Sequence, residues 1–370
     1  MTSRPRLLMV ARGRYRLPLD ETLARRFDAL AELLDVRVLG TRVGPGSDRR
    51  FVLAPALGGP FEGVLFYVLL PGRIARELRR FRPDAVLVQG THETALALLG
   101  RTLARTRTPI ICDVHGDWHA VTRLYGSPLR RLLDPLADVL ARFAVRRADG
   151  IRTVSGYTTR IVRGEGREPT STFPAYMDLR PFVDPPRVPV PDAPRVLFVG
   201  VLEAYKAIDV LAAAWRRVAR DVPGAALHVV GDGTRVEVVE ALVRDVEGVR
   251  WTRRLDTGGI AAALDEACLL VLPSRSEGMG RVIVEALCRG RPVVGSDVGG
   301  IPDLVVDGEN GVLVRPADVD ALAAALVALL TDRARLEQLA ANARPSADPW
   351  IATPQQFAER MRVLVDAVRR

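Results

Sequence analysis

Short apolar runs alternate with helix-period stretches along almost the whole chain. Runs of this length bounded by polar turns predict buried strands, and the stretches between them predict amphipathic crossover helices. Such alternation is typical of α/β proteins with parallel sheets. In the first half the predicted strands are residues 6–11, 36–39, 51–54, 85–89, 109–114 and 149–154. In the second half they are residues 195–200, 227–230, 249–252, 267–272 and 292–296.

A proline-rich segment separates the two series. Residues 184–194 contain five prolines in eleven positions, and such a stiff segment is unsuited to a central strand. We therefore expect an N-terminal domain over residues 1–184, a linker over 185–194 and a C-terminal domain over 195–349, with a last helix over 350–370. A chain of 370 residues is long enough for two such domains.

Charge is distributed unevenly between the two series. The net charge is +9, but residues 1–190 hold 31 Arg against 19 acidic residues, whereas residues 191–370 hold 22 basic against 25 acidic residues. A basic half indicates an anionic partner. Because no aromatic-rich or helix-turn-helix pattern accompanies the charge, nucleic acid is not expected. Membrane lipid or an anionic acceptor fits better.

The chain carries no pattern of export. Its first residues predict a strand and not a signal peptide, and Cys112, Cys268 and Cys288 stand alone in apolar segments without metal-ligand spacing. Isolated thiols of this kind are typical of a reducing compartment. We expect a cytoplasmic protein at the inner face of the cell membrane, with no metal site.

Residues 61–81 combine an apolar stretch, Val64–Leu70, with a following cluster of arginines. An apolar patch beside arginines is one pattern of a membrane-surface helix. The alternative is that the apolar part packs on the sheet and the arginines are solvated, and the sequence favours this second interpretation.

One basic residue differs from all the others. Of the 53 basic residues, 52 are Arg and the single Lys is Lys206. A coding preference for Arg explains the 52 but not the exception. Because an ammonium is a compact point charge, its retention predicts a specific anionic contact.

The strand at residues 267–272 leads into a turn that resembles an anion site. Gly278 and Gly280 flank the expected start of a helix, whose N-terminal N–H groups and dipole favour a negative ligand. Glu277 and Glu285 bracket the turn, and carboxylates prefer hydroxyl groups to phosphate. The pattern predicts a nucleotide sugar, while an ordinary helix cap explains the turn equally well at this stage.

Other candidate residues follow strands, where ligands of open parallel sheets bind. Gly13 lies among arginines after the first strand, and His115 follows the strand at 109–114. Gly200 ends the first predicted strand of the second series, and Gly231 and Arg254 follow its second and third strands. A histidine in such a place either acts on a substrate or has a structural role, and the sequence alone leaves both open.

Together these segments resemble the retaining family 4 glycosyltransferases. The similarity is nearly continuous from residue 195 to about 330 and is strongest at Glu277–Glu285, which has the family's E-x7-E spacing. Further matches are Pro292-Val293-Val294, Gly299-Gly300-Ile301-Pro302, Asp307-Gly308-Glu309-Asn310-Gly311 and, more loosely, Val114-His115-Gly116, Ala148-Asp149, Val154-Ser155 and Met177-Asp178.

The resemblance implies a GT-B architecture: α/β, with two Rossmann-like domains facing a cleft and a C-terminal helix that returns to the N-terminal domain. It implies transfer of a hexose from a UDP- or GDP-linked donor to a sugar or lipid-linked acceptor, with retention of configuration and without a cofactor or metal. The leaving phosphate would accept the acceptor's proton. The pathway implied is the synthesis of cell-envelope or exopolysaccharide glycans or glycolipids.

The resemblance also implies roles for individual residues. Glu277 would bind hydroxyls of the donor sugar, and Glu285 would bind the ribose. Lys206 would bind the diphosphate and His115 would lie beside the transferring sugar. The remaining implied donor contacts are Gly13, Gly200, Gly231, Arg254, Arg275 and the N–H groups of Gly278, Met279 and Gly280.

Two departures from the family pattern stand out. Val201 occupies the place of the family's usual arginine, which removes one charge from the diphosphate site, and Arg275, Arg12 or Arg14 are candidates to replace it. The first loop has Gly13 alone where the family has paired glycines. Two alternatives therefore stand beside a transferase: a sugar-nucleotide epimerase or hydrolase of the same fold, and an inactive nucleotide-sugar-binding partner subunit.

Overall fold

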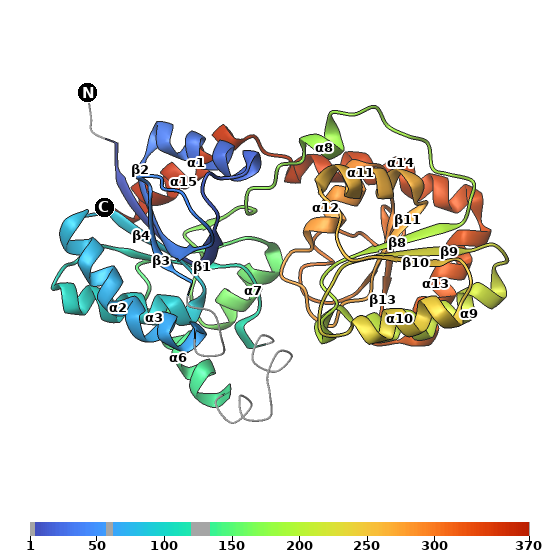
Figure 1. The fold of residues 1–370 in the computed structure, drawn as a ribbon, viewed down its shortest axis with the longest axis horizontal. Helices are drawn as coiled ribbons and strands as arrows, with labels where there is room; N and C mark the ends of the chain where they lie inside the picture. Colours follow the sequence, from blue (N-terminus) through green and yellow to red (C-terminus); the bar gives the residue numbers. More distant parts are fainter. Residues whose placement is uncertain (1–3, 57–61, 120–133, 370) are drawn as a thin grey trace. The chain divides into compact units, whose positions relative to one another are not determined.

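The computed structural model describes residues 4–56, 62–119 and 134–369. The chain divides into two compact units, one made of Met1–Met177 with Ala352–Arg370 and the other of Asp178–Ile351. Each unit is a parallel sheet covered by helices on both faces, as expected from the sequence (Figure 1). None of the described helices has the length and apolar character needed to cross a bilayer.

The first unit contains, within its described residues, a seven-stranded sheet of order β3-β2-β1-β4-β5-β6-β7. Every neighbouring pair is parallel. The strand order reverses between β1 and β4, which is where ligands of such sheets bind. The strands are β1 Arg6–Tyr15, β2 Asp35–Arg42, β3 Phe51–Pro55, β4 Ala85–Gln89, β5 Ile110–Val114, β6 Gly150–Thr153 and β7 Ser171–Thr172.

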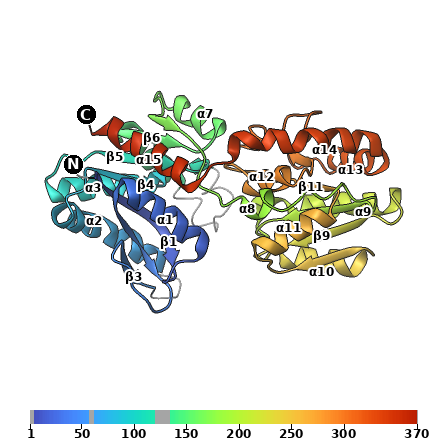
Figure 2. The ribbon, with the colours of Figure 1, turned by 90° about the horizontal axis from the view of Figure 1, so that it is seen from above.

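Helices cover the two faces of this sheet with separate cores. On one face α1 packs beside the last helix α15, and Phe27, Leu30, Phe357 and Leu364 lie in their shared core. Figure 2 shows α15 alongside α1, so the last helix returns to the first unit as expected. On the other face α2 packs against α3, and α3 against α6. The helices are α1 Glu21–Leu33, α2 Glu62–Arg80, α3 Thr91–Ala104, α6 Asp134–Arg147, α7 Gly156–Gly164 and α15 Pro354–Val368.

Strand β1 is longer than the sequence predicted. The prediction ended the strand at residue 11, but β1 continues to Tyr15 after an irregularity in its pairing with β2 between Val10 and Arg14. The Tyr15 ring packs against Phe51 at a centroid distance of 5.1 Å and holds the extension in place. A bulge of this kind interrupts the alternation of side chains, so the pattern suggested a loop.

The favoured interpretation of residues 61–81 holds only in part: Phe66 and Leu70 pack in the core and Arg76, Arg79 and Arg80 are exposed, but the apolar stretch is not buried throughout. Leu70 is fully buried, but Val64, Val68 and Leu69 are exposed. Residues spaced by four on a helix share one face, and on α2 this face points away from the sheet.

The second unit contains, within residues 178–351, a six-stranded parallel sheet of order β10-β9-β8-β11-β12-β13. Its order reverses between β8 and β11. The strands are β8 Arg195–Val199, β9 Ala226–Val230, β10 Val249–Thr252, β11 Leu269–Leu272, β12 Val293–Ser296 and β13 Gly311–Val314. The helices are α8 Arg180–Val183, the 3₁₀ turn η1 Ala204–Lys206, α9 Ile208–Asp221, α10 Val236–Asp245, α11 Thr257–Glu266, α12 Arg281–Cys288, α13 Val319–Thr331, α14 Arg333–Ala347 and the 3₁₀ turn η2 Asp348–Trp350.

The proline-rich segment, expected to be a linker, belongs to the second unit. Arg289, Arg291 and Arg333 donate hydrogen bonds to carbonyl oxygens spread from Pro185 to Pro191. Prolines lack the N–H that would pair in a sheet, and their carbonyls accept from guanidinium groups instead. The segment is therefore fixed along the second unit.

Candidate functional site

Lys206 and Glu277 meet at the carboxyl edge of the second sheet. Lys206 ends η1, in the loop that follows β8, and Glu277 lies in the turn that follows β11. Because β8 and β11 are neighbours at the point where the strand order reverses, their loops lie together. The Lys206 ammonium forms an ion pair with the Glu277 carboxylate, and the two side chains are only 10% and 14% exposed. The structure thus joins the single lysine to the first glutamate of the E-x7-E pair.

Close backbone contacts hold the Glu277 turn in position. The Gly300 N–H donates to the Glu277 carbonyl at 2.9 Å. A Cβ atom at Gly299 would stand 2.1 Å from that carbonyl oxygen, and one at Gly300 would stand 2.3 Å from the Gly278 oxygen. The glycine pair after β12 is therefore required by packing, and it fixes the turn that precedes α12.

Glu285 lies within α12 and is almost completely buried. Its nearest charged partner is Arg281, with 3.7 Å between nitrogen and oxygen. Burial raises the pKa of this carboxyl, and the nearby Arg281 only partly opposes the effect. A carboxylate kept in so costly a place is suited to a ligand that donates hydrogen bonds to it.

The other residues that the sequence predicted to contact a donor differ in their surroundings. Gly200 and Gly231 pack together, since a Cβ atom at Gly231 would stand 1.9 Å from the Gly200 oxygen. Arg254 follows β10 and is exposed, as is Val201. These positions lie at the carboxyl edge of the same sheet.

Arg275 is engaged within the protein. Its guanidinium contacts both oxygens of Asp209, at 2.8 and 2.6 Å, and the Ala204 carbonyl at 2.7 Å. The Asp209 carboxylate raises the pKa of Arg275 through this hydrogen-bonded pairing. Arg275 therefore ties the β11 turn to η1 and α9, so its guanidinium would have to leave Asp209 to replace the charge absent at Val201.

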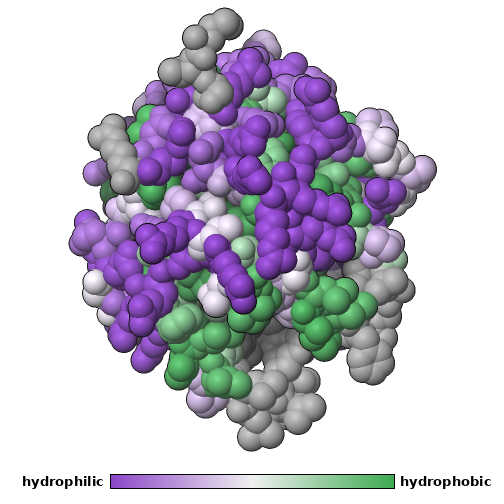
Figure 3. Space-filling model, turned by 90° about the vertical axis from the view of Figure 1, so that its left-hand side faces the viewer, coloured by the Kyte–Doolittle hydropathy of each residue, from purple (hydrophilic) through white to green (hydrophobic). Residues whose placement is uncertain are grey.

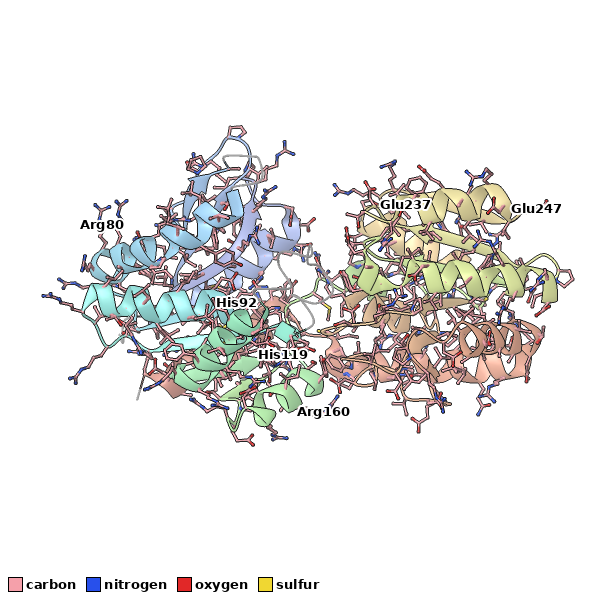
Figure 4. All side chains as sticks on the ribbon, turned by 90° about the horizontal axis from the view of Figure 1, so that it is seen from below. Arg80, His92, His119, Arg160, Glu237 and Glu247 are labelled. Carbon is pink, nitrogen blue, oxygen red and sulfur yellow. The ribbon has the colours of Figure 1, made fainter. Side chains whose placement is uncertain are left out.

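The first unit carries a pocket of about 380 Å³ at the carboxyl ends of β1, β4 and β5. Gly13 and His115 both line it, so the structure brings these two predicted residues together. The other lining residues are Arg12, Tyr67, Gln89, Gly90, Thr91, His92, Glu93, Val114, Gly116 and Trp118. The side chain of His92, at the start of α3, is labelled in Figure 4.

A buried charge network orients His115, and the sequence did not predict it. His115 Nε2 lies 2.9 Å from Asp113 Oδ2, and Arg152 donates to the other oxygen of Asp113 at 2.7 Å. Burial would raise the pKa of Asp113, but Arg152 and His115 outweigh it and lower the value to about 2. Asp113 is thus ionised and accepts a hydrogen bond from the Nε2–H group, which leaves Nδ1 for a ligand. A charged residue inside the predicted strand at 109–114 was the available signal.

A second polar group in the pocket centres on Glu93. Tyr67 donates to the Glu93 carboxylate at 2.8 Å, and the Arg12 guanidinium lies 5.6 Å from the Tyr67 ring centre. Burial, helped by Glu93, raises the pKa of Tyr67 to about 12, so its hydroxyl stays protonated. A Cβ atom at Gly90 would stand 2.3 Å from the Glu93 carboxylate, which explains the glycine. The pocket thus combines hydrogen-bond donors and acceptors.

No group of three or more His, Cys, Asp or Glu side chains is placed to hold a metal ion among the residues that the structure describes. The three cysteines are free and buried.

Two families match the chain, one on each unit. Glycosyl transferases group 1 matches residues 193–332, and Glycosyltransferase Family 4 matches residues 21–179. The chain belongs to glycosyltransferase family 4. The matched ranges contain the Lys206–Glu277 pair and His115, respectively.

Similar proteins agree with this membership. The family 4 chain is 37% identical over 153 residues to glycogen synthase of Mycobacterium tuberculosis, which covers 40% of this chain and 37% of that relative. It thus spans less than half the length of that relative.

Two solved structures share the fold. Sucrose-phosphate synthase of Thermosynechococcus elongatus has a TM-score of 0.78 at 20% identity, over 98% of this chain and 100% of that one. Anabaena HepE in complex with UDP-glucose has a TM-score of 0.70 at 19% identity, over 96% and 98%. The family 4 chain thus has the GT-B fold, with two Rossmann-like sheets.

Proposed function

We propose that this protein transfers a hexosyl group from a nucleotide-sugar donor to a hydroxyl group of an acceptor, with retention at the anomeric carbon. The observation that carries the proposal is the Lys206–Glu277 pair at the point where the second sheet reverses its strand order. A cation for the diphosphate and a carboxylate for sugar hydroxyls stand side by side there. Family membership supports the same reaction class.

The second unit would bind the donor. Lys206 and the N-terminus of α12 would stabilise the charge that develops on the leaving diphosphate. Glu277 would accept hydrogen bonds from sugar hydroxyls, and the buried Glu285 from the ribose hydroxyls. The Anabaena relative, whose structure holds UDP-glucose, supports a donor of this class.

The first unit would bind the acceptor. Its pocket presents the Glu93 carboxylate, the Tyr67 hydroxyl and the His115 ring, which together match the hydroxyl groups of a sugar or a sugar headgroup. Asp113 holds His115 by Nε2, so that Nδ1 can contact the reacting groups. A lipid-linked sugar is the acceptor class we favour, since the half of the chain that holds this pocket carries the excess of positive charge.

The chemistry is a substitution at one carbon. The bond from the anomeric carbon to the diphosphate oxygen breaks, and a bond from the same carbon to the acceptor oxygen forms on the same face. The acceptor proton passes to the leaving diphosphate, so charge and atoms balance. The protein contributes preorganised charge and orientation.

Incubation of the pure protein with a panel of UDP- and GDP-linked sugars tests the proposal. We expect one donor to raise Tm and to be hydrolysed slowly, and Lys206→Ala and Glu277→Ala to lose both effects. Glu247→Gln is the matched control, because this carboxylate is exposed in the turn between α10 and β10, at the amino end of that strand (Figure 4). The absence of any thermal shift with all donors would overturn the proposal.

The products separate the alternatives. Recovery of an epimerised sugar nucleotide would identify an epimerase. A hydrolase would release free sugar from the donor, and addition of an acceptor extract would not convert that sugar into a glycoside. Stabilisation by a donor that is never turned over would indicate a binding subunit, the alternative that the exposed Val201 in place of an arginine supports.

A further inference from the structure

We propose that α2, α3 and α6 of the first unit form a docking surface for an anionic lipid bilayer. Large apolar side chains are exposed on the outer faces of these helices. Val64 and Val68 on α2, and Leu136 and Val139 on α6, are each 61–68% exposed. Helix α3, which packs against both α2 and α6, adds the exposed Leu99. These five residues define the apolar surface.

Figure 3 shows hydrophobic side chains gathered on the lower part of one face of the molecule, below a broad hydrophilic area. Single exposed apolar residues are ordinary, but a cluster across three adjacent helices indicates an interaction site. The apolar surface is therefore suited to a partner that covers several helices at once.

The charges around the apolar surface select an anionic partner. Among the described side chains of α2, the exposed charges are arginines, Arg76 and Arg80 among them. On α6, Arg142 is exposed and pairs with Glu165 at 3.3 Å. The carboxylates of Glu77 and Glu93 are buried, and Asp138 is paired with His119 at 2.9 Å. Thus no described carboxylate on these three helices stands exposed and unpaired.

The opposite face of the same sheet differs in charge. Its helices α1 and α15 expose acidic as well as basic side chains, including Asp28, Glu32 and Glu359. The positive surplus is therefore a property of the α2–α3–α6 face, and charge complementarity points to a negatively charged partner there.

Along α2, exposed apolar residues give way to exposed arginines. Val64, Val68, Gly72, Arg76 and Arg80 recur at intervals of four, and each is exposed. The apolar half of this stripe would enter the acyl boundary and the arginine half would meet lipid phosphates. Figure 4 shows Arg80 pointing outward from its helix.

A second copy of the chain is a poorer occupant of this face. Two such surfaces would bring arginines against arginines, since residues 1–190 carry 31 Arg and 19 acidic residues. An anionic bilayer satisfies both the apolar side chains and the arginines. This inference stands apart from the proposed transfer reaction, because vesicle binding needs neither donor nor acceptor.

Vesicle sedimentation of the full chain tests the proposal. We expect binding to equimolar phosphatidylglycerol and phosphatidylcholine vesicles at low salt, little binding to pure phosphatidylcholine, and weaker binding at about 0.5 M NaCl. The double variant Val64→Glu/Val68→Glu should lose at least about tenfold in affinity. Arg76→Ser/Arg80→Ser should lose roughly 30-fold.

Val363→Glu is the matched control. Val363 is 67% exposed, almost as much as Val68, but it lies on α15 on the other face of the sheet. Equal losses in Val64→Glu/Val68→Glu and Val363→Glu, with unchanged Tm in both, would overturn the proposal. So would a wild-type protein that ignores anionic vesicles, or a dimer in sedimentation velocity that Val68→Glu dissociates, because a second copy would then occupy the surface.

Discussion

The ammonium of Lys206 is ion-paired with the carboxylate of Glu277, although the two residues lie 71 positions apart in the chain. Both side chains are largely shielded from water. In such surroundings a cation and an anion stabilise each other, and removal of one leaves the other uncompensated. An anionic ligand that binds Lys206 therefore competes with Glu277, whereas a sugar that donates hydrogen bonds to Glu277 helps to separate the pair.

The first prediction follows from this competition. Glu277→Gln should tighten the binding of bare UDP or GDP by about tenfold, because Lys206 loses its internal counter-charge. The same variant should weaken binding of the intact nucleotide sugar, because the amide is a poorer acceptor for sugar hydroxyls. Isothermal titration calorimetry with both ligands measures the two effects, and Glu247→Gln should leave them unchanged. A parallel loss for both ligands would contradict the competition.

The second prediction concerns Val201, which stands before η1 where the family usually has an arginine. Val201→Arg should tighten binding of a nucleoside diphosphate by roughly tenfold at low salt, and the gain should shrink as salt is added. The control is Val306→Arg, since Val201 and Val306 are both 48% exposed. Equal responses of the two variants would show only a general effect of net charge.

The third prediction concerns the buried Glu285. Burial raises its pKa, so the folded protein binds this proton more tightly than the unfolded chain. Glu285 therefore contributes its full stabilisation at pH values below its pKa in the unfolded chain, and this contribution is lost as the pH rises through its pKa in the folded protein. Glu285→Gln should raise Tm at about pH 8 and have little effect near about pH 4.

The same Glu285→Gln variant should weaken nucleotide binding by about tenfold, because it loses a charged acceptor for ribose hydroxyls. Thermal unfolding at the two pH values and calorimetry with UDP and GDP measure both effects. A variant that is both less stable at high pH and unchanged in binding would contradict this account of Glu285.

The fourth prediction concerns the pair of Asp113 and Arg152. The pKa of Asp113 is lowered to about 2, so its stabilising contribution is present above the unfolded value and is lost as pH falls toward about 2. Asp113→Asn should reduce the free energy of unfolding at neutral pH by about 3 kcal/mol, since the buried guanidinium of Arg152 loses its counter-charge.

Urea unfolding measures this loss, which should diminish between about pH 5 and about pH 2. The exposed Asp221 provides the control variant, Asp221→Asn. If the cost of Asp113→Asn were the same at every pH, the charge of Asp113 would not be its source.

Local patterns were sufficient to predict much of the fold. Buried parallel strands are almost continuous apolar runs, so the predicted limits of β8, β9 and β11 differ from the observed limits by at most two residues. Gly278 and Gly280 were sufficient to predict the turn at Glu277. Lys206 could be singled out because the other 52 basic residues are arginines. That these two side chains touch depends on the order of β8 and β11, which the alternation of strands and helices leaves open.

Long-range polar contacts were not predictable. Arg152 and Asp113 lie 39 positions apart on adjacent strands, and nothing in the local pattern around either residue indicates the other as its partner. Arg289 reaches carbonyls of the proline-rich segment more than 100 positions away, so a segment with the composition of a free linker is in fact held to the second unit. The proline content of such a segment predicts that it is stiff, but it does not predict which guanidinium groups bind its carbonyls.

The single lysine has a consequence for chemistry at the bench. Apart from the chain's N-terminus, Lys206 carries the one primary amine in an otherwise arginine-based sequence. An amine-selective acylating reagent would therefore mark the candidate donor site and no other side chain. Its ion pair with Glu277 should make that labelling slow, and a nucleoside diphosphate that covers the ammonium should make it slower still. The mass of one acylated peptide would then report occupancy of the site.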